Sequence, residues 1–428
     1  MLHGNTEWFV RDRFGLFIHW GLYAMPARGE WGKQTEEMSD EMYDAYFKYF
    51  DPDLYDPKLW AQAAANAGMK YFVATTKHHD GFCLWDSKLT DYKSTNTPAK
   101  RDLLTPMVDA FRSHDMRVGL YHSLIDWHHP DFLIDDVHSM RNHPDREKLN
   151  KNRDQAKYIA YLHGQVKELL TQFGQIDVLW FDFSYPKGIV PGVTGIGKGR
   201  DDWKSSELLQ LIRKLQPEIV LNDRLDLDDS WDVKTPEQCQ PREWVKVKGK
   251  SVVWEACQTI SGLWGYNRVV ASWKSTEQLI QMLIDTVSKG GNLLLNAGPT
   301  GRGEFDRQTL DRLNGIGEWM KRHSRSIYGC TEAPSEFVAP QDCRLTYNPE
   351  KNRMYVHIFA WPFLQLHLDG FKDKVEYAQL LNDATELKMT VPAESDQSPG
   401  SIGKNTLTLE LLSKKPDVTV PVVELFMK

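Results

Sequence analysis

The sequence has few cysteines and no long apolar run. Its five cysteines form no CxxC pair and show no zinc-like spacing, which favours reduced thiols over a disulfide framework. The N-terminal residues show no apolar segment of the signal-peptide type. No stretch approaches the roughly 18 apolar residues that a membrane span needs. We therefore expect a cytoplasmic protein with no membrane partner.

Clustered basic residues are also missing. The net charge is −7 and no long run of Lys or Arg interrupts the chain. Nucleic acids and anionic membranes are thus excluded as main partners, because both are recognised through such clusters. The 41% of hydrophobic and 26% of charged residues are those of a globular protein. A length of 428 residues suits one large α/β domain with a smaller companion.

Tryptophan, in contrast, is abundant, with 15 residues. Indole rings pack against the apolar faces of sugars and also offer a polar N–H group. Large hydrophobic cores use tryptophan as well, so this count alone does not decide between a sugar site and a core.

Short apolar segments alternate with longer segments of helical spacing. Buried strands are expected at residues 14–21, 70–77, 116–123, 176–183, 218–224, 251–257 and 290–299. Helices are expected at residues 56–69, 104–116, 156–174, 205–218, 275–291 and 306–329. Continuous apolar strands that alternate with helices predict a parallel sheet covered by helices. The number of units favours a (β/α)8-like barrel, with a doubly wound open sheet as the alternative.

The pattern changes after Tyr328. Polar and apolar residues alternate between turn residues, which predicts a small antiparallel β-sandwich. We expect a catalytic domain over residues 1–330 and the β-sandwich over residues 331–428. Pro362 places its segment at an edge or a bulge, and we expect residues 360–363 (AWPF) to contact either a neighbouring subunit of a homo-oligomer or the entrance of the site.

Polar residues gather where the expected strands end. They are His19, Trp20, Lys77, His78, His79, Asp80, Tyr121, His122, Asp126, Trp127, Asp182, Asn222, Asp223, Arg224, Glu255 and Asn296. The carboxyl ends of all barrel strands converge on one face, where active sites lie. Any single histidine could be a hydrogen-bonded core residue, but the whole set predicts one shared pocket.

Two carboxylates in such a pocket suggest glycoside hydrolysis. Asp182 lies in VLWFDF, and a carboxylate held rigidly among aromatic rings suits a nucleophile that forms and releases an ester. A retaining glycosidase needs a second carboxyl group about 5–5.5 Å away as the proton donor. Glu237 and Glu255 are the candidates.

Seven motifs then resemble one known family. In order along residues 8 to about 330 they are RFGLFIHWGLYAMPA, GMKYFVATTKHHDGFCLWDSKLTDY, LYHSLIDWHHPD, VLWFDF, NDR, KTPEQ and SKGGNLLLNAGPTGRGEF. Together they resemble the α-L-fucosidases of glycoside hydrolase family 29. The resemblance implies a retaining exo-α-L-fucosidase that releases terminal α-L-fucose from glycans or fucosides. It implies double displacement through a covalent fucosyl-enzyme, with no metal or other cofactor.

The same resemblance assigns roles to individual residues. It implies Asp182 as the nucleophile, and KTPEQ favours Glu237 as the acid/base, which leaves Glu255 as a hydrogen-bonding residue near the site. Trp264 would present its ring to the C5–C6 edge of fucose. His122 stands where the family has a second tyrosine. Substrate contacts are implied for His19, Glu30, Trp31, His78, His79, Tyr121, Arg224 and Trp264.

Three other interpretations are weaker. Residues 192–199 (GVTGIGKG) resemble a phosphate loop, but Gly199 stands where a Ser or Thr would hold Mg²⁺, so we expect a flexible loop near the site entrance. A metal hydrolase is disfavoured because the adjacent His78 and His79 would point to opposite sides of an extended chain. A lectin-like barrel would lack one of the two carboxylates.

Overall fold

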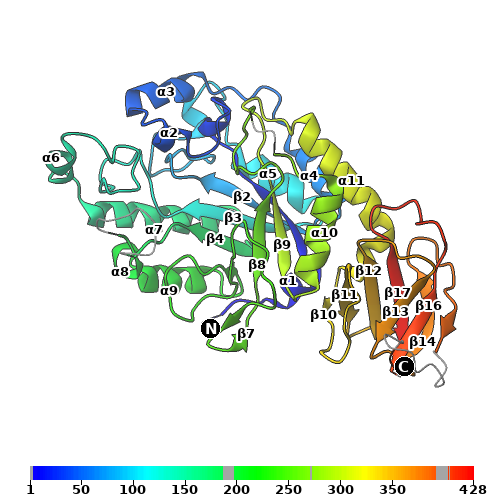
Figure 1. The fold of residues 1–428 in the computed structure, drawn as a ribbon. Helices are drawn as coiled ribbons and strands as arrows, with labels where there is room; N and C mark the ends of the chain where they lie inside the picture. The colour runs from blue at the N-terminus through cyan, green and yellow to red at the C-terminus, as the bar shows by residue number, and fades with distance from the viewer. Residues whose placement is uncertain (1–2, 187–196, 270–271, 392–402, 404) are drawn as a thin grey trace.

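The computed structural model describes residues 3–186, 197–269, 272–391, 403 and 405–428. Its larger part is a parallel sheet wrapped by helices, and its C-terminal part consists of antiparallel sheets packed beside helices α10 and α11 (Figure 1). Within the described residues, no helix is both long and apolar enough to cross a membrane.

Seven parallel strands form the central sheet, in the order β5-β4-β3-β2-β1-β9-β8. They are β1 (Phe14–Ile18), β2 (Tyr71–Lys77), β3 (Arg117–Ser123), β4 (Val178–Asp182), β5 (Val220–Leu221), β8 (Glu255–Thr259) and β9 (Asn292–Ala297). The last strand pairs with the first, as in a barrel, whereas a doubly wound sheet reverses direction at a switch point. The predicted (β/α)8-like barrel is therefore confirmed.

The eighth position of the barrel holds an irregular segment. Single parallel bridges join Asn222 to Val233, Lys234 to Trp254 and Glu237 to Cys257. Residues 233–237 thus run between the short strand β5 and strand β8. This segment closes the curled sheet and brings Glu237 to its rim.

Helices cover the outside of this sheet. The longer ones are α3 (Asp40–Tyr49), α4 (Pro57–Asn66), α5 (Leu104–Arg112), α7 (Gln155–Gln172), α9 (Ser205–Leu215), α10 (Thr276–Val287) and α11 (Arg307–His323). The short ones are α1 (Glu7–Asp12), α2 (Gly32–Thr35), α6 (Arg146–Asn150) and α8 (Arg200–Trp203), with 3₁₀ turns η1 (Leu22–Ala24), η2 (Ser94–Asn96) and η3 (Ser324–Ser326).

Side-chain caps begin several of the long helices. Asp56 accepts a hydrogen bond from the backbone of Lys58 with Pro57 at the first helical position, and Ser275 forms a capping box with Gln278. Asp306 caps α11 by accepting a hydrogen bond from the backbone N–H of Thr309.

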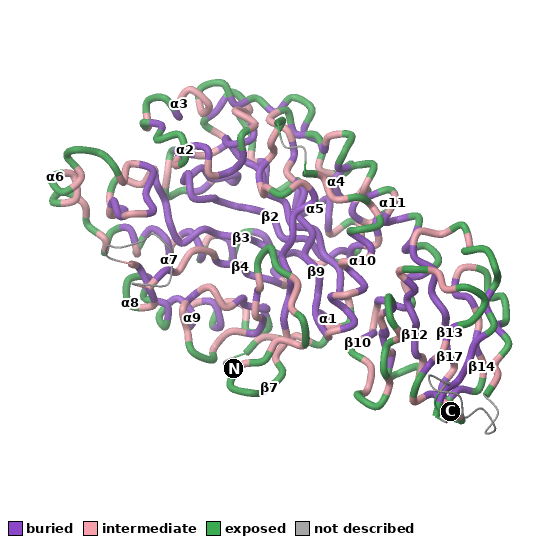
Figure 2. Tube along the Cα trace, in the orientation of Figure 1, coloured by how far each residue is buried: buried purple, intermediate pink, exposed green. Residues whose placement is uncertain are grey.

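The central strands are buried along their length (Figure 2), and alternate residues belong to two separate apolar clusters. Phe17, Val73, Tyr121, Trp180 and Leu294 meet in one cluster inside the barrel. Their neighbours along the strands, for example Leu16, Phe72 and Leu120, pack against the helices. Because both faces are buried, the strands appear in the sequence as continuous apolar runs.

The C-terminal sheets have their own core. One sheet has the order β10-β11-β12-β17-β14 and the other β13-β16-β15, and every pairing within them is antiparallel. The strands are β10 (Thr331–Glu332), β11 (Cys343–Asn348), β12 (Arg353–Ile358), β13 (Gln365–Asp369), β14 (Val375–Leu380), β15 (Met389–Thr390), β16 (Thr406–Glu410) and β17 (Val422–Met427). A small hairpin, β6 (Lys246–Val247) and β7 (Lys250–Ser251), belongs to the barrel part. The predicted antiparallel β-sandwich is confirmed, while the domain boundary at residue 330 stays a prediction.

Residues 360–363 lie between β12 and the edge strand β13, where Pro362 needs no ladder partner. Trp361 donates its indole N–H to the carbonyl of Leu412, whereas Phe363 is 81% exposed. A subunit contact at this edge stays a prediction.

Candidate active site

A cavity opens at the carboxyl ends of the barrel strands, as expected. It is lined by Phe17, His19, Trp31, His78, His79, Tyr121, Trp180, Asp182, Phe183, Arg224, Glu237 and Trp264. Nine of the ten predicted site residues are in this set. The structure thus brings together side chains that lie more than 200 positions apart in the sequence.

Asp182 is the last residue of β4 and lies at the centre of the cavity wall. Its Oδ2 accepts a hydrogen bond from the Tyr121 hydroxyl at 2.8 Å, and its Oδ1 accepts one from Nη1 of Arg224 at 3.1 Å. Burial raises the pKa of Asp182 from 3.8 to about 6, against the opposing charge of Arg224, while the neighbouring Glu237 raises it further. A carboxylate with these partners is rigidly held and poorly solvated.

The residue after Asp182 has unusual backbone geometry. Phe183 has a φ of 78°, in the left-handed region that a bulky residue rarely adopts. Its ring lies 5.1 Å from the ring of His79 and 5.3 Å from that of Trp31, measured between centroids. The sharp turn thus ends β4 at the carboxylate and adds an aromatic wall beside it.

Arg224 links the two predicted catalytic carboxylates. Its Nη1 donates to Asp182, and its Nη2 donates to Oε2 of Glu237 at 2.9 Å. The same guanidinium also donates hydrogen bonds to the hydroxyl and the backbone carbonyl of Thr235. Its central carbon, Cζ, lies 5.0 Å from the ring centroid of Trp180. The side chain of Glu237 is 41% exposed, against 15% for Asp182. One carboxylate is thus confined and the other is open to solvent and leaving groups.

Three histidines of the cavity are neutral. Burial lowers the pKa of His19 to about 3 and lowers the pKa values of His78 and His79 well below their usual range. The 3.7 Å contact between Nε2 of His79 and Asp182 is therefore not an ion pair. The hydroxyl of Ser123 donates to the carbonyl of Ile125, so Nδ1 of His79 must donate to Ser123. Its Nε2 is then a hydrogen-bond acceptor in the cavity.

The expectation that His78 and His79 point to opposite sides is wrong. Strand β2 ends at Lys77, and the following residues turn, so the alternation of an extended chain does not apply. Both rings line the cavity, with their centroids 4.0 Å apart.

Glu30 does not line the cavity. It is buried and accepts a hydrogen bond from the backbone N–H of Gly265, the residue after Trp264, at 2.7 Å. Burial raises its pKa. Glu30 thus supports the loop that carries Trp264, and its contact with a substrate stays a prediction.

The placement of Glu255 at a carboxyl strand end is also wrong. Strand β8 begins at Glu255, so this residue lies at the opposite end of the barrel and does not line the cavity. Its carboxyl group contacts the Tyr71 hydroxyl at 2.5 Å and the Trp180 indole N–H at 3.4 Å. Burial raises its pKa to about 7. Glu237 is therefore the second carboxylate of the cavity.

Other strand-end residues support the site from outside the cavity. His122 contacts the Thr76 hydroxyl at 2.9 Å, on the face opposite to Tyr121. Lys77 and Asp126 form a buried ion pair at 3.2 Å, and Asp80 accepts a hydrogen bond from Tyr43. Lys77 is thus paired with Asp126, and Asp80 with Tyr43, so these charged residues at the strand ends have structural partners outside the cavity.

Phe17, Trp180 and Phe183 line the cavity but were not predicted to belong to the site. The signal for the first two is period-2 spacing, because Phe17 precedes His19 by two residues and Trp180 precedes Asp182 by two. Phe183 follows Asp182 directly, and only its backbone turn brings it to the cavity.

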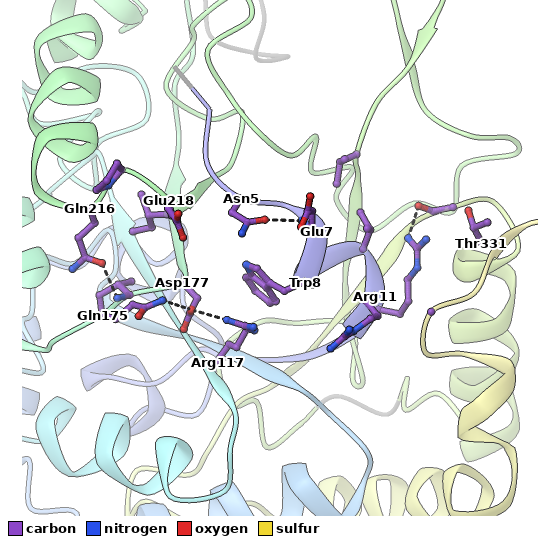
Figure 3. A pocket seen from close by; sticks show the side chains of 18 of the residues that line it. Asn5, Glu7, Trp8, Arg11, Arg117, Gln175, Asp177, Gln216, Glu218 and Thr331 are labelled. Carbon is purple, nitrogen blue, oxygen red and sulfur yellow. Dashed lines mark hydrogen bonds and ion pairs between the residues drawn. The ribbon is translucent and has the colours of Figure 1, made fainter. Parts of the chain in front are cut away.

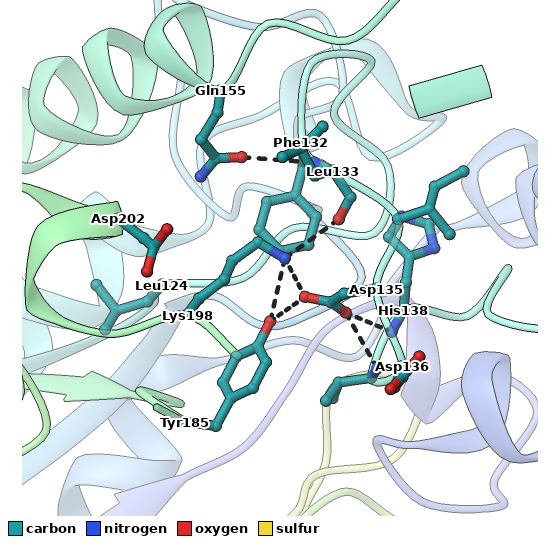
Figure 4. Close-up of polar contacts among 12 residues, drawn as sticks. Leu124, Phe132, Leu133, Asp135, Asp136, His138, Gln155, Tyr185, Lys198 and Asp202 are labelled. Carbon is teal, nitrogen blue, oxygen red and sulfur yellow. Dashed lines mark hydrogen bonds and ion pairs between the residues drawn. The ribbon is translucent and has the colours of Figure 1, made fainter. Parts of the chain in front are cut away.

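The segment that resembles a phosphate loop falls partly outside the described residues, which exclude residues 192–196. Lys198, at its end, is buried against Asp135 and the Tyr185 hydroxyl, and its ammonium lies 4.3 Å from the ring centre of Phe132 (Figure 4). This lysine belongs to a buried ion pair. In the described part of the chain, no group of three or more His, Cys, Asp or Glu side chains is placed to hold a metal ion.

A larger cavity, of about 1250 Å³, lies near helix α1 (Figure 3). Arg117 lies there between Asp177, at 3.2 Å, and the ring of Trp8, at 4.5 Å. Acidic and basic groups are mixed along its wall, as for Glu7, Arg11 and Glu218. It lacks the converging carboxylates of the smaller cavity, so size does not identify the active site.

Comparisons with known proteins identify relatives of this chain. The profile of a family described as Alpha-L-fucosidase matches residues 3–325. The plasma alpha-L-fucosidase of Homo sapiens is 31% identical over 392 residues, covering 83% of this chain and 76% of that protein. The solved alpha-L-fucosidase isoenzyme 1 from Paenibacillus thiaminolyticus is 42% identical, with a TM-score of 0.90 and coverage of 99% and 98% of the two chains.

A structure from Bacteroides thetaiotaomicron is also similar. It is a family 29 alpha-L-fucosidase trapped as a covalent intermediate with 2-fluoro-fucosyl fluoride, 26% identical, with a TM-score of 0.83 and coverage of 100% of this chain and 97% of that one. The profile match, the identity to curated relatives and the shared barrel all indicate the same family. The chain therefore belongs to the α-L-fucosidases of glycoside hydrolase family 29, which are glycoside hydrolases.

Proposed function

We propose that this enzyme is a retaining exo-α-L-fucosidase that releases terminal α-L-fucose from fucosylated oligosaccharides or glycosides by double displacement. The observation that carries the proposal is the shared guanidinium of Arg224, which holds Asp182 and Glu237 on one wall of an aromatic cavity. The trapped intermediate of the Bacteroides relative supports it.

In the first step, Asp182 attacks the anomeric carbon while Glu237 protonates the departing glycosidic oxygen. The C1–O bond to the leaving group breaks as an ester bond to Asp182 forms. Tyr121 and Arg224 hold the two oxygens of Asp182 and thereby fix its attack geometry. Buried and held in this way, Asp182 is poorly solvated, and it must be ionised to react.

In the second step, Glu237 as a carboxylate takes a proton from water, and the water oxygen attacks the anomeric carbon. The ester bond breaks, fucose leaves with its original anomeric configuration, and Asp182 is again a carboxylate. The exposure of Glu237 suits this role because both the leaving group and the incoming water approach from solvent.

The other walls of the cavity suit a deoxysugar. The neutral His79 presents an acceptor nitrogen to a sugar hydroxyl. Trp264 offers an apolar surface for the methyl-bearing edge of fucose. The centroid of its indole ring lies 5.7 Å from the centroid of the Phe17 phenyl ring. His19 and His78 complete the polar side of the pocket.

The test is hydrolysis of p-nitrophenyl α-L-fucoside by the wild type and by Asp182→Asn, with and without EDTA. We expect wild-type turnover that resists EDTA and is lost in the variant by a factor of at least about 10³. NMR of the first-formed fucose should show the α anomer, and mass spectrometry after treatment with 2-fluoro-fucosyl fluoride should show an adduct on the peptide with Asp182. A β anomer, loss of activity with EDTA, or an active Asp182→Asn enzyme would contradict the proposal.

A further inference from the structure

Asn296 lies directly behind His19, in contact with two walls of the cavity. It is 2% exposed and sits near the end of β9, where it is the register partner of Phe17 on β1. Register partners point to the same face of a sheet, and His19 follows Phe17 by two residues. The side chains of Asn296 and His19 therefore meet on the inner face of the barrel.

The amide group of Asn296 can have only one orientation. One of its polar atoms lies 2.7 Å from the backbone carbonyl oxygen of Trp264, and the other lies 2.7 Å from Nδ1 of His19. A carbonyl oxygen only accepts hydrogen bonds, so the amide nitrogen faces Trp264. The oxygen Oδ1 must then face His19.

This orientation decides the tautomer of His19. Because Oδ1 only accepts, Nδ1 of His19 must carry the proton, and Nε2 keeps its lone pair. His19 is buried and neutral, so a second proton on Nε2 is excluded near neutral pH. No hydrogen-bond partner for Nε2 is present among the described residues, and His19 lines the cavity.

We propose that Asn296 is a positioning residue that holds His19 as the Nδ1–H tautomer, so that Nε2 accepts a hydrogen bond from a sugar hydroxyl, and that it ties this histidine to the loop of Trp264. The amide of Asn296 thereby positions both His19, which contacts a sugar hydroxyl, and the loop of Trp264, which contacts the apolar edge of the sugar. His79 is held in the same tautomer by Ser123, so the cavity presents two bare imidazole nitrogens to hydroxyl donors.

The first experiment reads the tautomer directly, by NMR of the protein labelled with ¹⁵N-histidine. The signals of His19 are identified by their loss in His19→Gln. We expect a protonated Nδ1 and a bare Nε2 in the wild type, and a loss of this pattern in Asn296→Leu, which has a similar volume and neither polar atom. A wild-type His19 protonated on Nε2 would overturn the inference without any variant.

The second experiment is kinetic and rests on the proposed function. For Asn296→Leu we expect kcat/KM for p-nitrophenyl α-L-fucoside to fall about 10- to 100-fold, and the inhibition constant of L-fucose to rise in parallel. Unchanged kinetics together with an unchanged His19 pattern would also overturn the inference. An inactive wild type that shows the expected tautomer would instead contradict the proposed function alone.

Asn292 provides the matched control. It lies on the same strand at the opposite end of the barrel, is fully buried, and bonds Phe9 and Tyr71 instead of a cavity residue. Asn292→Ala should destabilise the fold but retain the His19 pattern and keep kcat/KM within about threefold. The same loss of the His19 pattern in this control would show a general structural effect and contradict a specific role of Asn296.

Discussion

Nη1 of Arg224 lies 3.1 Å from Oδ1 of Asp182, so a positive charge directly contacts the proposed nucleophile. Burial raises the pKa of Asp182 to about 6, and the positive charge of Arg224 is the main influence that opposes the rise. The same guanidinium holds Glu237 at 2.9 Å. Arg224 therefore links nucleophile, acid/base and pH dependence.

Replacing Arg224 by Met should shift the acid limb of the kcat/KM profile to higher pH. Without the cation the pKa of Asp182 rises further, so the carboxylate becomes protonated, and inactive, at a higher pH than in the wild type. We expect a shift of about one to three pH units. Arg224→Lys retains the charge and should shift the limb less. An acid limb that stays in place in Arg224→Met would show that Asp182 does not control it.

Glu237→Ala should lose activity in proportion to how poor the leaving group is. Alkyl fucosides need protonation of the glycosidic oxygen, so we expect a loss of about 10²- to 10⁴-fold for them and a smaller loss for p-nitrophenyl fucoside. Added azide should restore part of the activity, since it can attack the fucosyl-enzyme without base assistance. The measurement is a leaving-group series of kcat/KM with and without azide.

Glu255→Ala is the control for this assignment. It leaves the Tyr71 hydroxyl without its hydrogen-bond acceptor at the far end of the barrel, so we expect the free energy of unfolding to fall by about 1–3 kcal/mol. The leaving-group dependence should remain that of the wild type. If azide rescues Glu255→Ala instead of Glu237→Ala, the two roles must be exchanged.

Asp182→Asn should gain stability relative to the wild type as the pH rises. The pKa of Asp182 is about 6 in the folded protein and close to 3.8 when unfolded, so between these values only the folded state holds the proton. The contribution of Asp182 to stability is therefore present at low pH and lost as the pH rises through about 4 to 6. Asparagine does not ionise, so the difference should grow by about 1–3 kcal/mol over this window.

Urea unfolding of both proteins at pH 4, 5, 6 and 7.5 measures this difference. A free-energy difference that stays constant over these pH values would contradict a raised pKa for Asp182. Asp53→Asn serves as the control, because Asp53 is exposed and its pKa is lowered by Arg302, which predicts no gain over the same window.

Lys198→Met should destabilise the protein by about 3–5 kcal/mol, because it leaves Asp135 buried without its cation. Among the described residues, Asp135 then keeps the Tyr185 hydroxyl and the backbone N–H groups of Val137 and His138 as partners (Figure 4). The double variant Lys198→Met/Asp135→Asn removes both charges and should recover part of the loss. Equal unfolding free energies for the single and the double variant would show that the ion pair is not the cause.

Much of the site can be predicted from the sequence because it depends on which residues stand at the end of each strand. Apolar runs that alternate with helical segments require a parallel sheet covered by helices, and in such a barrel the residue that follows a strand lies at the active face. Asp182, Arg224 and His19 could be assigned on this basis. The aromatic residues two positions before a catalytic side chain, Phe17 and Trp180, carry the same information through the period of the strand.

Only the tertiary structure shows that Glu237 lines the cavity and Glu255 does not. The strand expected at residues 251–257 begins at Glu255 in the structure, and this shift moves Glu255 from one end of the barrel to the other. The position of a strand along the barrel axis depends on its register with both neighbours, which the local pattern does not contain. Three other features depend on contacts between distant segments, so the local pattern does not contain them either. They are the bridge between Glu237 and Cys257, the turn that brings both His78 and His79 to the cavity, and the Asn296 amide that joins His19 to Trp264.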